Sequence, residues 1–364
     1  AGSLPDSVGG SQGGASTRYE ASLAASYEVD VWGRFRKRAK AAKLEARAVR
    51  ADARALAMTM TSRVADAWFD AVAARRQLEL IDRQIEASKE LLELTKVRYR
   101  RGLAEELDVI QQEQNVESLR GERARAELSL ETAEHRLAVL TGREPGEDVE
   151  IGPETLPDLP ALPEPGVPAD LLTRRPDVRA ALVRLKAADR RTAAAVADRL
   201  PRVKLSTSLL AQATQVGDLL DRLIWSATGT VSQSIFEGGR LKAAQRRTES
   251  EAERRLYAYG QTVLEALKDV RDALVGERRQ KEVVASLERE QAKAKEALAS
   301  ARAQFREGAV DYFRVLEALQ QLQSVQRELV RARRDQISYR TSLCRAIGGS
   351  WADSVDPLGG EDSE

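Results

Sequence analysis

The chain has 364 residues, a formal net charge of +1, and a composition that is 32% charged and 4% aromatic. The balanced charge excludes the overall basic character of nucleic-acid-binding proteins, and no apolar run of about 18 residues marks a transmembrane helix. One His and one Cys cannot form a common zinc site or a disulfide framework, so we expect no metal and no cofactor.

The N-terminal region combines a loop with a strand. Residues 1–16 are rich in Gly and Ser and predict a flexible loop. Residues 17–32 alternate between apolar side chains, such as Tyr19 and Tyr27, and polar or small ones. This period of two predicts a β-strand. Its length, its single apolar face and the Trp32 at its end fit a transmembrane strand, although such a strand could also cover a soluble core.

The period changes after Gly33. Residues 35–100 contain neither Gly nor Pro and carry apolar or small residues at alternating spacings of four and three. This heptad pattern predicts a coiled-coil helix about 100 Å long. A tip at 101–105 and a return helix over 106–141 complete an antiparallel hairpin. The seam is formed by Met60, Val64, Ala67, Ala71, Ala74, Leu78, Ile81, Ile85, Ser88 and Leu92.

A proline-rich linker precedes a second set of elements. Residues 143–168 hold seven of the 11 prolines and predict an ordered or semi-rigid linker that is neither a helix nor a central strand. The tail over 350–364 is acidic and is expected to be disordered. Between them we expect a helix over 170–200, strands over 202–211 and 225–236, a long helix over 240–306, a tip at 307–311 and a return helix over 312–347.

The second half repeats the landmarks of the first at a constant offset of 206 positions. A constant offset indicates an internal duplication, with repeat 1 at 17–142 and repeat 2 at 169–349. The predicted fold is mainly α with amphipathic β-strands that could be transmembrane, built from a duplicated strand and long α-hairpin. Helices of matched length, packed side by side, can wall a tube. The recurring residues are Gly33 and Gly239, Arg34 and Arg240, Gly102 and Gly308, and Gly142 and Gly348.

Three segments carry the most specific patterns, at 27–34, 171–181 and 305–318. In this order, and with the duplication, they resemble the TolC-like outer-membrane efflux proteins, especially the branch whose members are usually lipid-anchored. The resemblance covers about 17–349. The helix and first strand that the family carries ahead of the outer loop are not found, so the chain looks like a member without its N-terminal segment.

The resemblance implies a passive, non-enzymatic export duct. It implies a homotrimer whose strands form a shared β-barrel in the outer membrane and whose helices form a coiled-coil α-barrel tunnel in the periplasm. Small molecules would pass from an inner-membrane pump through a periplasmic adaptor protein into this duct. The implied partners are therefore a second and third copy of the chain, the adaptor, the pump and outer-membrane lipid, and no nucleic acid.

The resemblance places adaptor contacts at the two hairpin tips. Ordinary helix-hairpin turns, in which Gly supplies a positive φ, are the alternative interpretation. The tip residues are Arg101, Gly102, Leu103, Gly308, Ala309, Val310 and Asp311.

A channel gate is implied just above the tips. Glu317 matches a family carboxylate position, and three-fold symmetry would turn it into a ring that focuses negative potential and binds cations. Arg314 stands where some members carry an acid. Solvated charges on a coiled-coil face are the alternative interpretation. The gate candidates are Asp108, Phe313, Arg314, Glu317 and Gln320.

The strand-to-helix junctions form a third candidate region, where the barrel would meet the tunnel. Their arginines could pair with carboxylates there or snorkel to the lipid interface, and we favour a structural role. The junction residues are Trp32, Gly33, Arg34, Gly239 and Arg240.

Two other functions compete with the duct. A soluble coiled-coil scaffold explains the heptads but not amphipathic strands at equivalent places in both repeats. A periplasmic adaptor also carries a helical hairpin, but small Gly-rich β-domains should flank it. An enzyme is disfavoured because the sequence holds no catalytic constellation, phosphate loop or metal cluster.

Overall fold

The computed structural model describes residues 19–147, 151–152, 156–161, 174–213 and 223–349, together with single positions at 215, 218 and 221. The predicted outer loop 1–16, the predicted tail 350–364 and the first residues of the predicted helix 170–200 lie outside this part of the chain. The elements are β1 (Tyr19–Val29), α1 (Arg34–Arg100), α2 (Glu106–Leu140), α4 (Pro176–Ala197), β2 (Arg202–Ala213), β3 (Leu223–Ser232), α5 (Arg240–Arg306) and α6 (Tyr312–Ala346).

The two hairpins have identical element lengths. Helices α1 and α5 each have 67 residues, and α2 and α6 each have 35. The turns also repeat in their bonding, since Leu103 N donates to Arg98 O and Ala309 N donates to Gln304 O, both at 2.9 Å. Gly102 and Gly308 have φ of +67° and +77°, a conformation that residues with a Cβ rarely adopt. The duplication read from the sequence is therefore present in the backbone.

The chain folds into two units, each described by itself. The first unit comprises 1–46 and 184–256, and contains the sheet with the adjoining ends of α1, α4 and α5. The second unit comprises 47–183 and 257–364, and contains the two helical hairpins and the linker.

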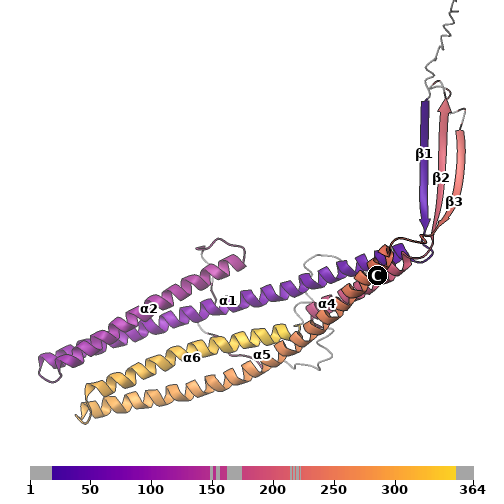
Figure 1. The fold of residues 1–364 in the computed structure, drawn as a ribbon. Helices are drawn as coiled ribbons and strands as arrows, with labels where there is room; N and C mark the ends of the chain where they lie inside the picture. The colour runs from indigo at the N-terminus through magenta and orange to yellow at the C-terminus, as the bar shows by residue number, and fades with distance from the viewer. Residues whose placement is uncertain are drawn as a thin grey trace, which may run out of the picture. The chain divides into compact units, whose positions relative to one another are not determined.

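The sheet of the first unit has three antiparallel strands in the order β1-β2-β3 (Figure 1). The last pairs at its helical end are Val29 with Val203 and Arg202 with Ser232. Pairing stops there because the next residue of the central strand is Pro201, which has no N–H to donate.

The strand bounds correct three sequence predictions. Strand β1 ends at Val29 and not at 32, and β3 ends at Ser232 and not at 236, because the central strand offers no partner beyond Arg202. Strand β3 also begins at Leu223 and not at 225, since Leu223 still pairs with Ala211. At the other end β2 continues to Ala213, past the predicted 211, since β1 still pairs with it there.

Helix ends also differ slightly from prediction, and their hydrogen bonds give the reason. Helix α1 begins at Arg34, where Asp30 accepts the backbone N–H groups of Phe35 and Arg36 at 3.1 and 2.9 Å. Helix α4 ends at Ala197 and not at 200, because Arg199 N and Leu200 N donate to Val196 O and Ala197 O, three residues back, at 3.1 Å. Pro201 disfavours the α conformation at Leu200 itself. Helices α2 and α6 end one residue before the predicted 141 and 347.

Within the second unit, each hairpin buries a narrow apolar seam. Ile81 and Ile85 of α1 pack on Leu119 and Ala126 of α2. In the second hairpin, Val284 and Leu287 of α5 pack on residues of α6. Nearer the second tip, Leu298 packs with Val315 and Leu319, and Leu91 of α1 joins that cluster. The two hairpins therefore share part of their core.

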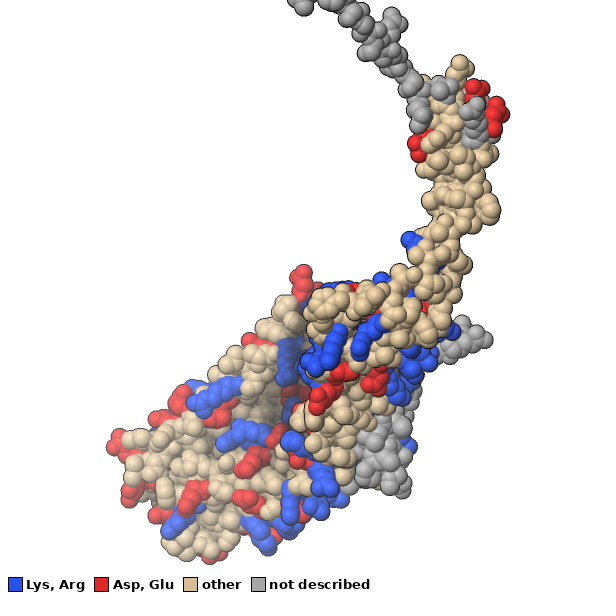
Figure 2. Space-filling model, turned by 45° about the vertical axis from the view of Figure 1, so that its right-hand side comes forward, with Lys and Arg blue, Asp and Glu red and all other residues tan. Residues whose placement is uncertain are grey.

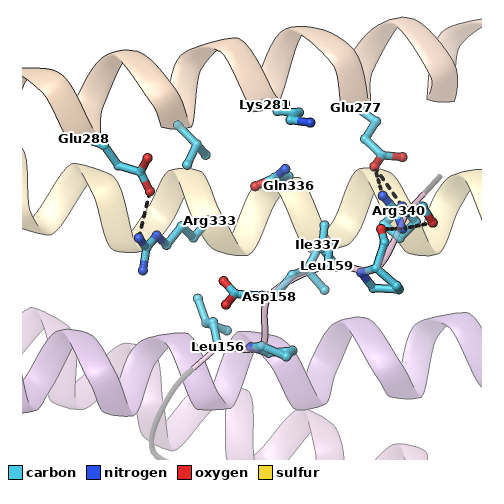
Figure 3. A pocket seen from close by; sticks show the side chains of 14 residues that line it. Leu156, Asp158, Leu159, Glu277, Lys281, Glu288, Arg333, Gln336, Ile337 and Arg340 are labelled. Carbon is cyan, nitrogen blue, oxygen red and sulfur yellow. Dashed lines mark hydrogen bonds and ion pairs between the residues drawn. The ribbon is translucent and has the colours of Figure 1, made fainter.

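The described part of the linker is held against both hairpins. Ile151 lies in a cluster with Val72 and Trp68, and its carbonyl accepts a bond from Arg75 at 3.0 Å. Further on, Arg340 of α6 donates to Pro160 O at 2.7 Å and forms an ion pair with the buried Glu277. These contacts border a pocket of about 310 Å³ between the linker, α5 and α6, whose Glu277–Arg340 pair lies at one end (Figure 3).

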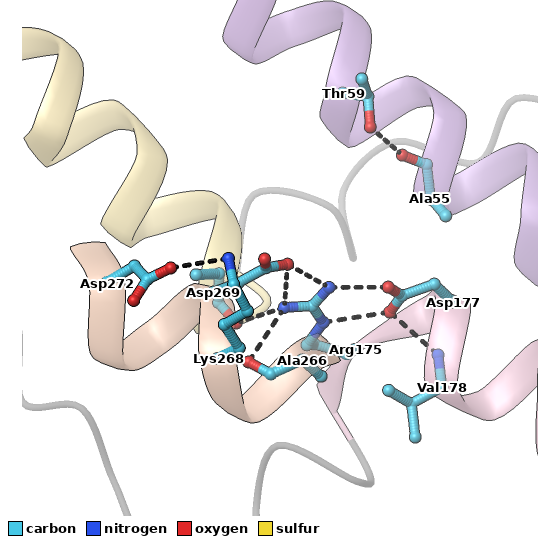
Figure 4. Close-up of polar contacts among 10 residues, drawn as sticks. Ala55, Thr59, Arg175, Asp177, Val178, Ala266, Lys268, Asp269 and Asp272 are labelled. Carbon is cyan, nitrogen blue, oxygen red and sulfur yellow. Dashed lines mark hydrogen bonds and ion pairs between the residues drawn. The ribbon is translucent and has the colours of Figure 1, made fainter. Parts of the chain in front are cut away.

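A second arginine ties the start of α4 to the second hairpin. The Arg175 guanidinium, only 11% exposed, contacts Asp177 at 2.7 Å and Asp269 at 3.1 Å (Figure 4). It also donates to the carbonyl of Ala346, at the end of α6, at 3.4 Å. One side chain thus joins α4, α5 and α6.

Candidate functional site

The sheet is amphipathic across all three strands. The register aligns Leu23, Leu209 and Trp225 on one face, and places Ser26, Ser206 and Thr228 on the other. Leu23 and Trp225 are 73% and 70% exposed. The surface over the strands in Figure 2 carries almost no Lys or Arg. Leu210 and Ile224 are exceptions on the polar face. A sheet with an exposed apolar face is suited to contact lipid.

The junction residues close the helical end of the sheet. The Arg34 guanidinium contacts Glu28 at 2.6 Å and Asp198 at 3.2 Å, and stacks 4.1 Å from the Phe35 ring. Trp32 donates its indole N–H to Pro201 O at 2.8 Å. These bonds tie α1 to the end of α4 and fit the structural role predicted for Arg34.

The second junction is simpler than the first. Arg240 pairs with Glu237, three residues earlier in the same segment. Gly33 and Gly239 both have positive φ, of +70° and +82°. The duplicated junction therefore keeps its turn geometry while its ion pairs differ.

The tip residues present mostly exposed side chains. Leu103 is 62% exposed, Arg101 and Ala309 are exposed, and Val310 is half-buried. The Asp311 carboxylate accepts the backbone N–H of Arg314 at 3.2 Å and so caps α6. The tips are brought together within the second unit, because the Arg98 guanidinium stacks 4.5 Å from the ring of Phe305.

The gate candidates take different roles. Arg314 and Glu317 form an exposed ion pair at 3.1 Å, and Phe313 is 51% exposed. Asp108 accepts the backbone N–H of Glu105 at 3.1 Å and so caps the start of α2.

Sequence reasoning missed a layer of buried polar side chains that joins the two hairpins. Gln112 and Ser88 are fully buried, and the Gln112 amide donates to Ser88 O at 2.7 Å. Tyr312 donates its hydroxyl proton to Gln112 Oε1 at 2.9 Å. Gln323 donates to Ser88 Oγ at 3.2 Å. We call this set the polar layer; its members are Gln84, Ser88, Gln112, Asn115, Tyr312 and Gln323.

The polar layer extends to the gate candidates through Gln320, which donates to Asn115 Oδ1 at 3.2 Å. Burial raises the pKa of Tyr312 to about 12, so its hydroxyl stays protonated and able to donate at neutral pH. Because buried polar groups are costly when unpaired, this layer favours one register between the hairpins. The sequence did contain a signal, since Ser88 is the polar member of an otherwise apolar or alanine-rich seam.

Two kinds of feature are absent from the part of the chain that the structure describes. No helix there combines the length and apolarity needed to cross a bilayer. The same residues hold no group of His, Cys, Asp and Glu that could ligate a metal ion.

The amphipathic sheet, the duplicated hairpins and their glycine turns define the channel component of an outer-membrane efflux system. The chain belongs to the family described as outer membrane efflux protein, which matches residues 3–143 and 167–349. Relatives of this chain include outer membrane proteins named for pyoverdine export and for a toluene efflux pump.

Individual relatives agree with the family. The chain is 30% identical over 345 residues to the pyoverdine export outer membrane protein OpmQ of Pseudomonas putida, covering 93% of this chain and 72% of the relative. The open state of the Neisseria gonorrhoeae MtrE outer membrane channel aligns with a TM-score of 0.81 at 26% identity, covering 94% of this chain and 78% of that one. CusC aligns with a TM-score of 0.84 at 24% identity, covering 92% and 78%, and shows the same fold.

Proposed function

We propose that the chain is the passive duct of a tripartite efflux system and works as a homotrimer. The strands of three copies close a barrel in the outer membrane, and the helices form a tunnel in the periplasm. An inner-membrane pump and a periplasmic adaptor deliver small molecules into the tunnel. The duct supplies a path and no chemistry, so the pump selects the cargo.

One observation carries this proposal: the register that separates apolar from polar side chains across three strands. A soluble sheet with an exposed face of this kind would expose Leu23, Trp225 and Val231 to water, at 73%, 70% and 72% exposure. Burying such side chains in hydrocarbon is worth about 1.5–3 kcal/mol each. The opposite face, with Ser206 and Thr228, is suited to a hydrated lumen.

Cysteine accessibility in a conducting bilayer tests the orientation of the sheet. In a Cys344→Ser background, Thr228→Cys places a thiol on the polar face, and Ala227→Cys places one on the apolar face next to it. We expect a charged, water-soluble thiol reagent to reduce the current of Thr228→Cys and to leave Ala227→Cys unchanged. Block of both variants, or of Ala227→Cys alone, would contradict the proposed orientation.

The hairpin tips are the proposed contact with the adaptor. Support comes from the exposure of Leu103, at 62%, and from the matching geometry of the two turns. A photo-crosslinking amino acid at Leu103 should capture the adaptor. The same amino acid at Leu264, a helix residue of the same unit with 63% exposure, is the matched control. Equal capture at both positions would remove the tips from the proposal.

The gate proposal concerns the exposed pair Arg314 and Glu317. In a trimer this pair would occur three times around the constriction. The net charge of each Arg314–Glu317 pair is close to zero. Support comes from the ion pair at 3.1 Å, which holds the guanidinium against the carboxylate. The charge that ions meet at this level would then depend on both residues and not on Glu317 alone.

A further inference from the structure

The helical ends next to the sheet are much more basic than the rest of the chain. Lys and Arg make up six of the ten residues in 34–43, three of the ten in 190–199 and four of the eight in 240–247, and Asp198 is the only acid. The whole chain has a net charge of only +1. We call the Lys and Arg residues of these three segments the basic collar.

Part of the basic collar is neutralised internally. Arg34 and Arg38 share Asp198, and Arg191 contacts Glu45 at 3.0 Å. The other members include Lys40, Lys43, Lys242, Arg246 and Arg247. These five are without an ion pair to any described residue. All five are also exposed. Clustered cations of this kind create a positive potential that attracts anions.

The position of the basic collar limits the kind of anion. The exposed apolar face of the sheet reaches Tyr27, and Val31, Trp32 and Phe35 continue as exposed apolar side chains at 51%, 45% and 43%. The collar begins in the same segment. A transmembrane segment that leaves the hydrocarbon core of a membrane typically carries apolar residues first, then aromatic residues, and then Lys and Arg.

Distances along α1 agree with this order. Lys40 and Lys43 lie about 9 and 14 Å along the helix from Arg34. The headgroup zone on each side of a bilayer is about 5–8 Å thick, and charges act over roughly a further 8 Å at physiological ionic strength. The collar lysines of α1 are therefore within electrostatic reach of lipid phosphates when the sheet spans the hydrocarbon core.

We propose that the basic collar binds the phosphate groups of anionic phospholipids in the periplasmic leaflet of the outer membrane. The proposal rests on the proposed function, because it needs the sheet in that membrane. Binding would fix the depth of the duct and offset the repulsion among the collar cations. Each Lys or Arg near an anionic surface changes lipid binding by roughly five-fold.

The test measures lipid preference on the whole protein. The protein is reconstituted into phosphatidylcholine nanodiscs with increasing phosphatidylglycerol, and the ratio of the two lipids retained by the protein is measured. Wild type should enrich phosphatidylglycerol, and salt should weaken the enrichment. The double variant Lys40→Gln/Lys43→Gln should lose about 25-fold in preference, whereas Lys40→Arg/Lys43→Arg should retain it. Lys281→Gln/Lys295→Gln removes two exposed lysines of α5 that, like Lys40 and Lys43, are without an ion pair to any described residue, and is the matched control.

Three outcomes would overturn the proposal. The first is that neither wild type nor the Lys40→Gln/Lys43→Gln variant retains more phosphatidylglycerol than phosphatidylcholine. Another is a change in the anion-to-cation permeability ratio with lipid preference unaltered, which would place the collar on the lumen. The third is loss of the trimer in the Gln variant with lipid preference unaltered, which would assign the collar to contacts between copies. The conductance of wild type is measured in parallel. A wild-type protein that does not conduct would refute the proposed function as a duct, and not only the lipid binding.

Discussion

The polar layer offers the sharpest test of how the hairpins are held together. The perturbations are Tyr312→Phe, which removes one buried hydroxyl, and Gln112→Leu, which removes the amide that bridges Tyr312 and Ser88. The two bonds measure 2.9 and 2.7 Å, and the two side chains are 3% and 0% exposed. No solvent is available to replace the lost partners.

The expected magnitudes follow from this geometry. A buried polar group left without a partner costs about 1–3 kcal/mol. Tyr312→Phe strands the Gln112 carbonyl, so we expect a loss of about 1.5 kcal/mol. Gln112→Leu removes both the bond from Tyr312 and the bond to Ser88 O, so we expect about 2–3 kcal/mol. The double variant should cost about the same as Gln112→Leu alone, because both single changes break the same bond.

Hydrogen exchange at the tips is the suitable assay, since it reports the free energy of local opening. Protection of the amides near Gln112 and Tyr312 should fall about ten-fold in Tyr312→Phe and about 30–150-fold in Gln112→Leu. Gln114→Leu, an exposed position of the same helix, is the control. Strictly additive losses in the double variant, or an equal loss in Gln114→Leu, would refute the reasoning.

The remaining predictions concern charge, packing and pH. Arg314 contacts the Glu317 carboxylate at 3.1 Å, so Arg314→Ala should free this negative charge and raise the cation selectivity of single channels. Glu317→Ala should lower the cation selectivity. Unchanged conductance and selectivity in both variants would discard the gate assignment. Gly276→Ala would place a Cβ 2.5 Å from the Tyr339 ring, so the free energy of unfolding should fall by about 1–3 kcal/mol. Gly121→Ala is the control, because its Cβ would meet no atom within 4 Å, and it should gain up to about 1 kcal/mol from helix propensity. Burial opposes ionisation of Asp177, but the bonds from Arg175 and the Val178 N–H outweigh it and hold the pKa of Asp177 below its ordinary 3.8. The stability that the Asp177 carboxylate contributes is therefore present above pH 3.8 and is lost as the pH falls through the lowered pKa. Asp177→Asn should cost about 1 kcal/mol of stability at pH 7, and its melting temperature should converge with that of wild type in strong acid. A difference in melting temperature that is the same at all pH values would contradict the predicted sign.

Much of the backbone could be predicted because its signals are local. The heptad spacing of 35–100 and the glycines at the turns identify helices whose ends depend on neighbouring residues. The strand ends could not be predicted in this way. Residues 233–236 contain neither Gly nor Pro to mark the end of a strand, but whether they pair depends on Pro201, which lies more than 30 positions earlier in the sequence. The end of β3 is therefore set by its pairing register with β2 and not by its own local sequence pattern.

The side-chain roles were harder to predict than the helices. Gln84 and Gln323 meet across 239 positions, and no local pattern reports that contact. Asp108 stays a gate prediction, and its carboxylate also caps a helix, a role that its position above the tip alone did not indicate. Competing roles for one Asp are common near helix N-termini, where a free backbone N–H is always close.

The equal lengths of the paired helices restrict how this protein can evolve. Deleting one residue from α1 alone would turn everything beyond it by about 100° and shorten that arm by about 1.5 Å. The Arg98–Phe305 stacking and the polar layer would both lose alignment. Length changes should therefore be tolerated only in whole heptads, or in both copies at once. Natural variation in size should accumulate in the loops and the linker while the four hairpin arms keep their dimensions.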